Sequence, residues 1–252
     1  RILIDARATT KAILDGLAWL TDGAARGDSL VFHYSGHGSQ VPDRNGAEKT
    51  DRLDEILCPY DLDWDRPLTD DDLAAACTAV PKGALLTVIL DCCHSGTGLR
   101  EFVPTAAHVY SRLFDCAATA CECLPPTSVG PAARTRPRFL AHPGAPYPAP
   151  PCPRRPARRF GVGVTRSNAV LIAACRDDQT SADAFIDGGY HGAHTYYLCR
   201  ALREADRSAT YRDIVAAAGA SIARAGFDQI PQLEGPAPLL SSPFPGNGRG
   251  TV

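Results

Sequence analysis

The stretch ALLTVILDCCHSG (residues 84–96) joins an apolar run to a group of reactive side chains. Its first part is apolar at nearly every position, which is typical of a strand buried on both faces of a parallel sheet. The run ends in Asp91, two cysteines and His94. Because ligands bind beyond the carboxyl ends of parallel strands, we expect Cys92 or Cys93 to lie at a functional site.

The rest of the chain alternates between strand-like and helix-like segments. Two further apolar runs with strand character are LVFHYSG (30–36) and AVLIAAC (169–175). Helical patterns cover four segments, at residues 9–24, 69–80, 192–205 and 210–226. Alternation of this kind predicts an α/β fold, here a three-layer α/β/α sandwich with a mostly parallel sheet.

Two of these helices carry the same start signal. Thr69 stands three residues before Asp72, and Thr210 stands three residues before Asp213. This spacing is a variant of the capping box, in which each side chain accepts a hydrogen bond from the other residue's backbone N–H. Gly226 predicts the end of the last helix, because glycine readily adopts the left-handed conformation that follows a helix.

Composition limits the classes of protein that the chain can belong to. Its 252 residues, 44% hydrophobic and 21% charged, suffice for one globular domain with a sizeable core. A formal net charge of −2 argues against broad binding of nucleic acid or anionic membranes. We therefore expect neither of these partners, and we expect a monomer. The chain begins at Arg1 and contains no methionine, so we expect that a structural segment precedes it.

Ten cysteines are too few for a disulfide scaffold in a chain of this length, which favours a reducing, cytoplasmic location. Cys116, Cys121 and Cys123 could suggest zinc, but a second pair of ligands with zinc-site spacing is missing from the sequence. Four other cysteines lie in apolar or periodic segments, where we expect small buried side chains: Cys58, Cys77, Cys175 and Cys199.

One segment departs from the alternation of strands and helices. Residues 125–160 are crowded with proline and arginine and show no periodicity, so we expect a disordered surface insertion. It separates a region at 1–124 from a region at 161–235, and we expect the tail at 236–252 to be irregular as well. We expect these regions to form one domain together.

A second polar motif, HYSGHGSQ (33–40), follows another predicted strand. If the two strands are parallel, this motif ends at the same sheet edge as Cys93. His37 lies between two glycines, which allow a tight turn that presents the imidazole and the Gly38 N–H outward. A thiol becomes a good nucleophile when a neighbouring base takes its proton, so His37 is the best candidate base. His33 is the competing base, but its place inside the strand pattern favours a packing role.

These motifs resemble those of the metacaspases of type I organisation, which are caspase-like cysteine peptidases. HYSGHGSQ is similar to their histidine motif, and DCCHSGT (91–97) is similar to their cysteine motif. Other segments resemble acidic and small-subunit regions of the family: DRLDEILCPYD (51–61), LTDDDL (68–73), CRDDQTSAD (175–183), GAHTYYL (192–198) and PQLEG (231–235). The resemblance implies a caspase-like fold for most of the chain.

The resemblance also implies an activity, namely cleavage of proteins or peptides after Arg or Lys through a Cys-His dyad and a thioester acyl-enzyme. Cys93 matches the nucleophile, because it directly precedes His-Ser-Gly, and His37 matches the general base and acid. The N–H groups of Gly38 and Cys93 match the oxyanion hole, while Asp91 and Ser35 match the pocket for the basic side chain. Programmed cell death is the implied process.

An active site with this preference could also cut its own chain. The proline-rich segment offers arginines as candidate self-cleavage sites in an accessible backbone: Arg134, Arg136, Arg138, Arg154, Arg155, Arg158 and Arg159.

Two family features are incomplete in this sequence. Metacaspases carry a first strand and an acidic pocket residue for which this chain has no counterpart, so we expect a sheet that lacks its first strand. The resemblance implies calcium as a possible cofactor through Asp54, Asp70 and Asp71, whereas Arg100 stands at another acidic position of the family. The alternatives are an inactive signalling or scaffold module and, more remotely, a zinc-dependent hydrolase.

Overall fold

The computed structural model describes residues 1–42, 53–93, 135–143, 168–176 and 179–245. Its centre is a four-stranded sheet with the strand order β1-β5-β7-β10. The first three strands are parallel, and β10 is antiparallel to β7. The bounds of these strands are Ser29–Ser35 (β1), Leu85–Asp91 (β5), Ala169–Ala173 (β7) and Gln232–Glu234 (β10). The three strands predicted from apolar runs are confirmed.

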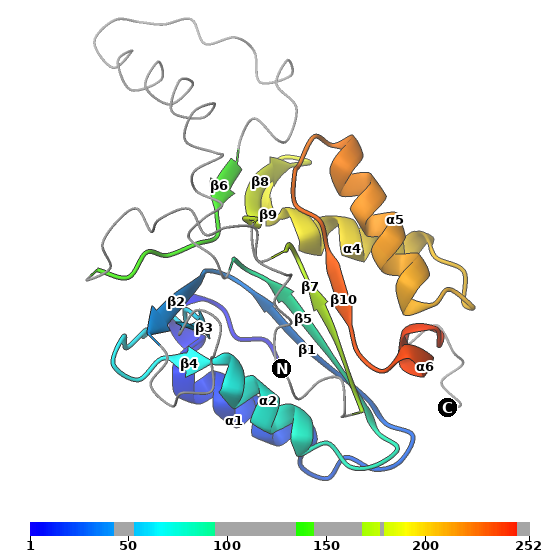
Figure 1. Ribbon diagram of the computed structural model, residues 1–252, viewed down its shortest axis with the longest axis horizontal. Helices are drawn as coiled ribbons and strands as arrows, with labels where there is room; N and C mark the ends of the chain where they lie inside the picture. Colours follow the sequence, from blue (N-terminus) through cyan, green and yellow to red (C-terminus); the bar gives the residue numbers. More distant parts are fainter. Residues whose placement is uncertain (43–52, 94–134, 144–167, 177–178, 246–252) are drawn as a thin grey trace, which may run out of the picture.

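Helices cover both faces of this sheet (Figure 1). The two faces are covered by α1 with α2 and by α4 with α5, so the predicted three-layer α/β/α sandwich is confirmed. The helices run over Thr10–Thr21 (α1), Asp70–Thr78 (α2), Ala193–Glu204 (α4) and Tyr211–Arg224 (α5), and a short 3-10 helix, η1, covers Asp5–Arg7.

Both predicted capping boxes are present. Thr69 caps α2 together with Asp72, and Thr210 caps α5 together with Asp213. Gly226 follows the end of α5 with a φ of 86°, the left-handed conformation that was expected there. These local signals therefore fix where two of the covering helices begin.

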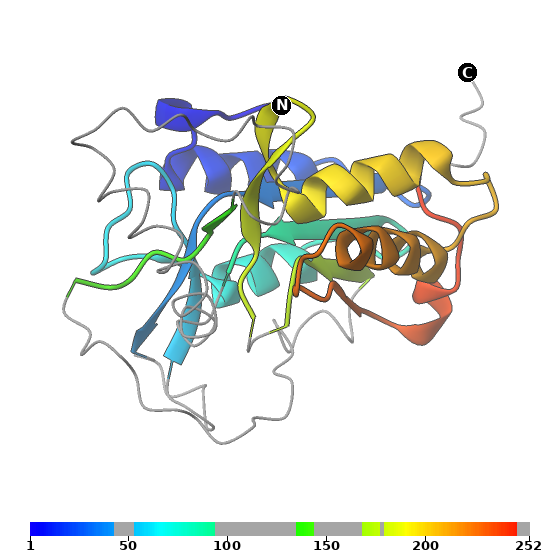
Figure 2. The same ribbon diagram turned by 90° about the horizontal axis from the view of Figure 1, so that it is seen from above.

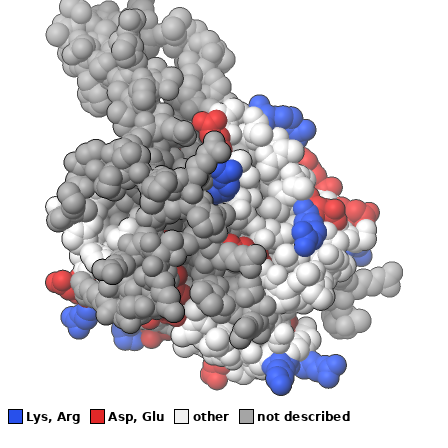
Figure 3. Space-filling view, in the orientation of Figure 1, with Lys and Arg blue, Asp and Glu red and all other residues white. Residues whose placement is uncertain are grey.

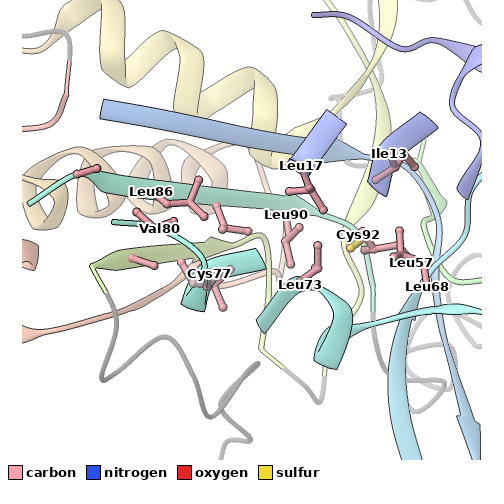
Figure 4. Close-up of a cluster of buried hydrophobic side chains, with 14 residues drawn as sticks. Ile13, Leu17, Leu57, Leu68, Leu73, Cys77, Val80, Leu86, Leu90 and Cys92 are labelled. Atoms are coloured by element: carbon pink, nitrogen blue, oxygen red, sulfur yellow. The ribbon is translucent and has the colours of Figure 1, made fainter. Parts of the chain in front are cut away.

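The core beneath α1 and α2 is built from alternate residues of β5 (Figure 4). Leu86, Val88 and Leu90 point to this face and pack against Ile13 and Leu17 of α1. The opposite face of β5 presents Ile89 to the cluster beneath α4 and α5. Burial on both faces explains why the strand is apolar at consecutive positions.

Two smaller antiparallel sheets flank the central one, with the strand orders β2-β3-β4 and β6-β8-β9. Both lie beyond the carboxyl ends of β1 and β5 (Figures 1 and 2), so they border the edge where the two polar motifs end. Their strands cover Gly38–Pro42 (β2), Leu53–Leu57 (β3), Leu68–Thr69 (β4), Thr135–Pro137 (β6), Ala182–Ile186 (β8) and Gly189–Gly192 (β9).

Two segments differ from the irregular structure expected of them. Residues 135–143 of the proline-rich segment include β6, because its backbone finds a partner in β8. The tail includes the helix α6 (Ala237–Leu240), and Leu240 and Phe244 are buried against the α5 side of the core. The local composition does not indicate the pairing of β6 or the packing of the tail, because both depend on residues far away in the chain.

β1 lies at the edge of the described sheet, where Val31 is 45% exposed. On the face shown in Figure 3, the described side chains of both charge signs are interspersed rather than gathered by sign. None of the helices among the described residues has the length and apolar character needed to span a membrane.

Candidate active site

The two polar motifs emerge side by side at one edge of the central sheet. Ser35, the last residue of β1, pairs with Asp91, the last residue of β5. The chain at Gly38 then passes so close to Cys93 that a Cβ atom on Gly38 would lie 2.0 Å from the Cys93 carbonyl oxygen. Only glycine fits this approach, which brings the His37 turn against the cysteine motif.

The two adjacent cysteines face different surroundings. Cys92 points into the core beneath α1 and α2 (Figure 4), where burial raises the pKa of its thiol well above the usual value. Cys93 Sγ instead lies 2.8 Å from the backbone N and 3.2 Å from the carbonyl oxygen of Ser181, at the start of β8. Within the described part of the chain, Cys93 Sγ and the His37 ring share no hydrogen bond.

Backbone contacts hold the turn that carries His37. The carbonyl oxygen of His37 accepts a hydrogen bond from the Cys58 N–H at 3.0 Å and lies 2.7 Å from Tyr34 Oη. Partial burial lowers the pKa of His37, and the nearby cation of Arg138 lowers it further. Since a general base must be neutral to accept a proton, both effects favour the form of His37 that can do so.

The backbone N–H groups of Gly38 and Cys93 converge on a single carbonyl oxygen, that of Arg138. The donor–acceptor distances are 2.9 Å from Gly38 and 3.4 Å from Cys93. Two N–H groups aimed at one carbonyl oxygen form the geometry by which acyl-transfer enzymes stabilise an oxyanion.

Asp91 forms the buried acidic floor of a pocket beside these N–H groups. Its side chain accepts hydrogen bonds from Ser181 Oγ at 2.5 Å and from the backbone N–H and hydroxyl of Thr195 at 2.8 and 2.7 Å. Burial alone would raise the pKa of Asp91, but the Arg138 cation, His194 and these hydrogen bonds outweigh it and hold the pKa below its usual value. The carboxylate is therefore ionised and directed at a cation.

The side chain of Arg138 fills this pocket. Nη1 lies 2.6 Å from Ser35 Oγ, 2.9 Å from the Asp91 carbonyl oxygen and 4.0 Å from Asp91 Oδ1. Nη2 donates to Asp183 Oδ1 at 2.9 Å. A Cβ atom on Gly192 would lie 2.1 Å from Asp91 Oδ2 and 2.9 Å from Arg138 Cζ, so this glycine leaves the room that the guanidinium uses.

Several residues of the pocket were not predicted individually from the sequence: Ser181, Asp183, Gly192 and Thr195. They lie in CRDDQTSAD and GAHTYYL, two segments whose resemblance to the small-subunit region assigns no role to a single residue. His33, the competing base, instead hydrogen-bonds the Thr195 hydroxyl at 3.1 Å. The packing role expected of His33 therefore includes support of the pocket.

Of the three aspartates predicted to bind calcium, Asp70 and Asp71 begin α2, and Asp54 lies in β3 close enough to act on the charge of Asp70. Burial raises the pKa of Asp70 to about 6, and the carboxylates of Asp71 and Asp54 raise it as well. Among the residues that the structure describes, however, no three His, Cys, Asp or Glu side chains are placed to hold one metal ion. The calcium site therefore stays a prediction. Arg100 lies outside the described residues, as do the three cysteines named as possible zinc ligands.

Comparison with known proteins gives a consistent set of relatives. The sequence pattern described as "Metacaspase, peptidase C14 domain" matches residues 2–101. The chain is 32% identical to Metacaspase-1 of Arabidopsis thaliana over 216 residues, which are 84% of this chain and 48% of that protein. Metacaspase-1 of Pyricularia oryzae is 33% identical over 92% of this chain and 58% of its own length. For Metacaspase-3 of Trypanosoma cruzi the identity is 30%, over 94% of this chain and 60% of the relative.

The fold also has a counterpart among solved structures. The crystal structure of a protein from Geobacter sulfurreducens matches with a TM-score of 0.56 and 20% sequence identity, covering 96% of this chain and 80% of the other. At that identity the likeness concerns the fold alone.

Fold and site together define the class of caspase-like α/β/α domains. Within this class, the chain belongs to the metacaspase family, the peptidase C14 domains whose pattern it carries in residues 2–101. It spans 48–60% of the length of the three relatives named above.

Proposed function

We propose that the protein is a cysteine endopeptidase that cleaves peptide bonds after Arg or Lys, with Cys93 as nucleophile and His37 as base. The observation that carries the proposal is the position of Arg138. Its guanidinium lies in the pocket floored by Asp91, while its carbonyl oxygen receives the N–H groups of Gly38 and Cys93. Arg138 therefore occupies the position that a substrate residue would occupy directly before the bond to be cleaved.

The reaction needs each group in turn. The Cys93 thiol gives its proton to His37 and its sulfur attacks the carbonyl carbon, while the N–H groups of Gly38 and Cys93 stabilise the oxyanion. His37 then protonates the departing amine, leaving a thioester on Cys93. Water, deprotonated by His37, hydrolyses the thioester and releases a carboxylate. The Cys93 side chain must turn from Ser181 toward the carbonyl carbon for the first step.

The preference for a basic residue follows from the charges around the pocket. Asp91 is fully buried, and Asp183 accepts a hydrogen bond from the same guanidinium. A cationic side chain is attracted by these carboxylates, whereas an aspartate would be repelled and would lose its hydration without gaining a partner.

Calcium enters this proposal only as an effector. Burial, and after it the carboxylates of Asp71 and Asp54, raise the pKa of Asp70 to about 6. A cation bound beside these three aspartates would offset their mutual repulsion. No step of the reaction is assigned to calcium, because the described aspartates do not form a three-ligand group.

A second candidate function is an inactive signalling or scaffold module. The observation in its favour is the Cys93 thiol, whose hydrogen bonds go to Ser181 instead of His37. Hydrolysis that depends on Cys93 would exclude this alternative.

The test uses the chain with Arg138→Gln, since the native arginine occupies the pocket that a peptide must enter. Matched peptides with Arg, Lys or Asp before the scissile bond are incubated with this chain, with and without calcium. We expect hydrolysis of the Arg and Lys peptides, which Cys93→Ala abolishes and Cys92→Ala leaves largely intact. Hydrolysis of the Asp peptide alone, or activity that survives Cys93→Ala, would refute the proposal.

A further inference from the structure

A chain of hydrogen bonds connects β1 and α4 to the acidic floor of the pocket. It starts at His33, passes through the Thr195 hydroxyl and ends at the Asp91 carboxylate. We propose that His33 is a positioning residue that sets how tightly the pocket holds a basic side chain: it is neutral while the pocket contains a cation and takes up a proton when the pocket is empty. This role rests on the proposed function and adds to it a specificity-determining residue and a proton.

The charge of Asp91 fixes the direction of each hydrogen bond in this chain. An ionised carboxylate can only accept, so the Thr195 hydroxyl donates its hydrogen to Asp91 Oδ2 at 2.7 Å. The Thr195 oxygen is then left as an acceptor toward His33 Nε2, which lies 3.1 Å away. His33 therefore carries a hydrogen on Nε2 and donates it to Thr195.

The register of the central sheet places His33 beneath α4. His33 pairs with Ile89 of β5, and two residues further along Ser35 pairs with Asp91. Ile89 packs in the cluster that α4 covers, and alternate residues of a strand share a face, so His33 and Ser35 both lie on the α4 side. β1 thus supplies one side chain that touches the guanidinium in the pocket, Ser35, and one that holds the support of the pocket floor, His33.

The Thr195 hydroxyl needs a donor on its other side to stay directed at Asp91. The backbone N–H of Thr195 is fixed by the first turn of α4, but its hydroxyl hydrogen can rotate about the C–O bond. The His33 N–H occupies the acceptor side of the Thr195 oxygen, which leaves the hydroxyl hydrogen free only toward the carboxylate. Loss of the His33 donor should therefore weaken the hold on Asp91 without removing any group that touches the substrate.

Asp91 is fully buried, so its charge needs a positive partner. The guanidinium of Arg138, 4.0 Å away, supplies that charge from the position of a substrate's basic side chain. When the pocket holds no cation, the buried carboxylate is left without compensation, which is costly. A proton on His33 restores a positive charge that stays connected to Asp91 through Thr195.

The charged groups around His33 favour this exchange. Partial burial lowers the pKa of His33, Asp91 on β5 raises it, and the guanidinium of Arg138 lowers it, so the pKa rises when the cation leaves the pocket. His194 on α4 also faces this site, but it is fully buried with a pKa of about 4 and stays neutral near pH 7. His33 is exposed along β1, and among the described residues its Nδ1 shares no hydrogen bond, so Nδ1 is the nitrogen that takes up the proton.

The proton on His33 and the basic side chain in the pocket therefore oppose each other. By reciprocity, a bound cation that lowers the proton affinity of His33 is itself bound more weakly once His33 is protonated, by the same factor. Each unit by which the bound cation lowers the pKa corresponds to tenfold weaker binding of that cation at low pH. The affinity for an arginine peptide should consequently fall as the pH drops below the ordinary histidine pKa of 6.5.

The first experiment measures binding without catalysis. Three chains share Cys93→Ala and Arg138→Gln and differ only at one position, with His33, His33→Gln or His33→Leu. A fluorescent peptide amide whose last residue is arginine is titrated into each at pH 8. Glutamine keeps an N–H donor for Thr195, so its affinity should stay within about twofold of the His33 chain, whereas leucine has no donor and should bind at least about threefold more weakly than glutamine. Equal affinities of the glutamine and leucine variants would overturn the positioning role.

The second experiment repeats the titrations at pH 5.5, after a thermal melt has shown that each chain is folded there. The His33 chain should bind the arginine peptide at least about threefold more weakly than at pH 8, while His33→Gln, which cannot take up the proton, should keep most of its affinity. His37 is present in both chains, so the difference between them reports His33. The matched citrulline peptide is uncharged and should bind equally at both pH values. The same loss in His33→Gln, or the same loss for citrulline, would overturn the proton uptake.

The third experiment separates support of the pocket from a part in the reaction. In the Arg138→Gln chain with its thiol intact, His33→Leu should raise KM for an arginine peptide at pH 8 by at least about threefold and leave kcat nearly unchanged. The reason is that His33 contacts Thr195 and not the reacting atoms. A fall in kcat with unchanged KM would instead make His33 a participant in proton transfer and would overturn the proposal.

The outcomes also distinguish this role of His33 from the proposed function. If the chains prefer the arginine peptide to the citrulline peptide but the His33 variants behave alike, only the role of His33 fails. If the His33 chain binds the two peptides equally at pH 8 and the Arg138→Gln chain hydrolyses neither, the proposed function itself fails.

Discussion

Asp91 Oδ2 accepts two hydrogen bonds from Thr195, one from its backbone N–H at 2.8 Å and one from its hydroxyl at 2.7 Å. Thr195 lies in the first turn of α4, where the helix dipole and the free N–H groups favour a negative charge. The carboxylate at the end of β5 is thus fixed by a helix from the later part of the chain. The pocket exists only when both parts have folded together.

Replacing the carboxylate should remove the charge preference of the pocket. In the Arg138→Gln background, Asp91→Asn should reduce kcat/KM for an Arg peptide by on the order of 100-fold, because removing one partner of a buried charge pair costs about 2–5 kcal/mol. The matched control is a peptide with citrulline, the neutral analogue of arginine, whose kcat/KM should change much less. An equal loss for both peptides would mean that Asp91 acts on the fold and not on the charge.

Filling the space at Gly192 should close the pocket. Gly192→Ala places a Cβ atom 2.1 Å from Asp91 Oδ2, so the carboxylate or the arginine must move and Arg-peptide hydrolysis should fall. Gly16→Ala is the matched control, because no atom lies within 4 Å of a Cβ at that helical position. That control should leave hydrolysis unchanged and raise stability by up to about 1 kcal/mol. Unchanged hydrolysis in Gly192→Ala would contradict the pocket geometry.

A buried hydroxyl pair in the core should show strong coupling. Thr87 of β5 and Tyr211 of α5 are both fully buried, and their oxygens lie 2.5 Å apart. Tyr211→Phe leaves the Thr87 hydroxyl without this partner, so we expect a loss of about 1–3 kcal/mol in the free energy of unfolding. Thr87→Val in addition should recover part of that loss. Strictly additive effects in urea denaturation would show that the pair is not coupled.

The buried His194 should make stability depend on pH. Burial lowers the pKa of His194 from 6.5 to about 4, with Asp91 opposing this shift and His33 adding to it. Below pH 6.5 the unfolded chain takes up a proton that the folded chain refuses, so stability falls as the pH drops toward about 4. The shift corresponds to about 3 kcal/mol. Asp91, whose pKa is lowered, contributes a further loss only at lower pH.

The measurement is the free energy of unfolding at pH 7 and pH 4.5 for the native chain and for His194→Gln. The variant has no imidazole to protonate, so its loss between the two pH values should be smaller by roughly 2–3 kcal/mol. The same loss in both proteins would mean that other groups cause the pH dependence.

Local sequence signals predicted much of the fold and the positions of the two motifs. The apolar run at residues 84–91 indicated a doubly buried parallel strand because every position faces a helix layer, and the Thr-x-x-Asp spacings located the starts of α2 and α5. These features depend on residues that are close together in the chain, so they can be predicted from the sequence.

The strand β6 and the acid Asp183 could not be predicted in this way. Thr135–Pro137 has no alternation and contains a proline, and it becomes a strand only because β8 supplies its partner. Asp183 reaches the pocket because β8 starts beside the end of β5, a neighbourhood set by the topology of the sheets. The sequence does not distinguish Arg138 from the other arginines of the proline-rich segment, whereas the three-dimensional structure does.

The most direct test of the account is covalent labelling of the Arg138→Gln chain with a peptidyl chloromethyl ketone that ends in arginine, followed by peptide mass mapping. We expect one adduct, on the sulfur of Cys93, and no labelling by the matched reagent that ends in aspartate. That result would show that the reactive thiol is Cys93 and that the pocket beside it selects arginine. An adduct on Cys92, or labelling by the aspartate reagent in preference to the arginine reagent, would contradict the account.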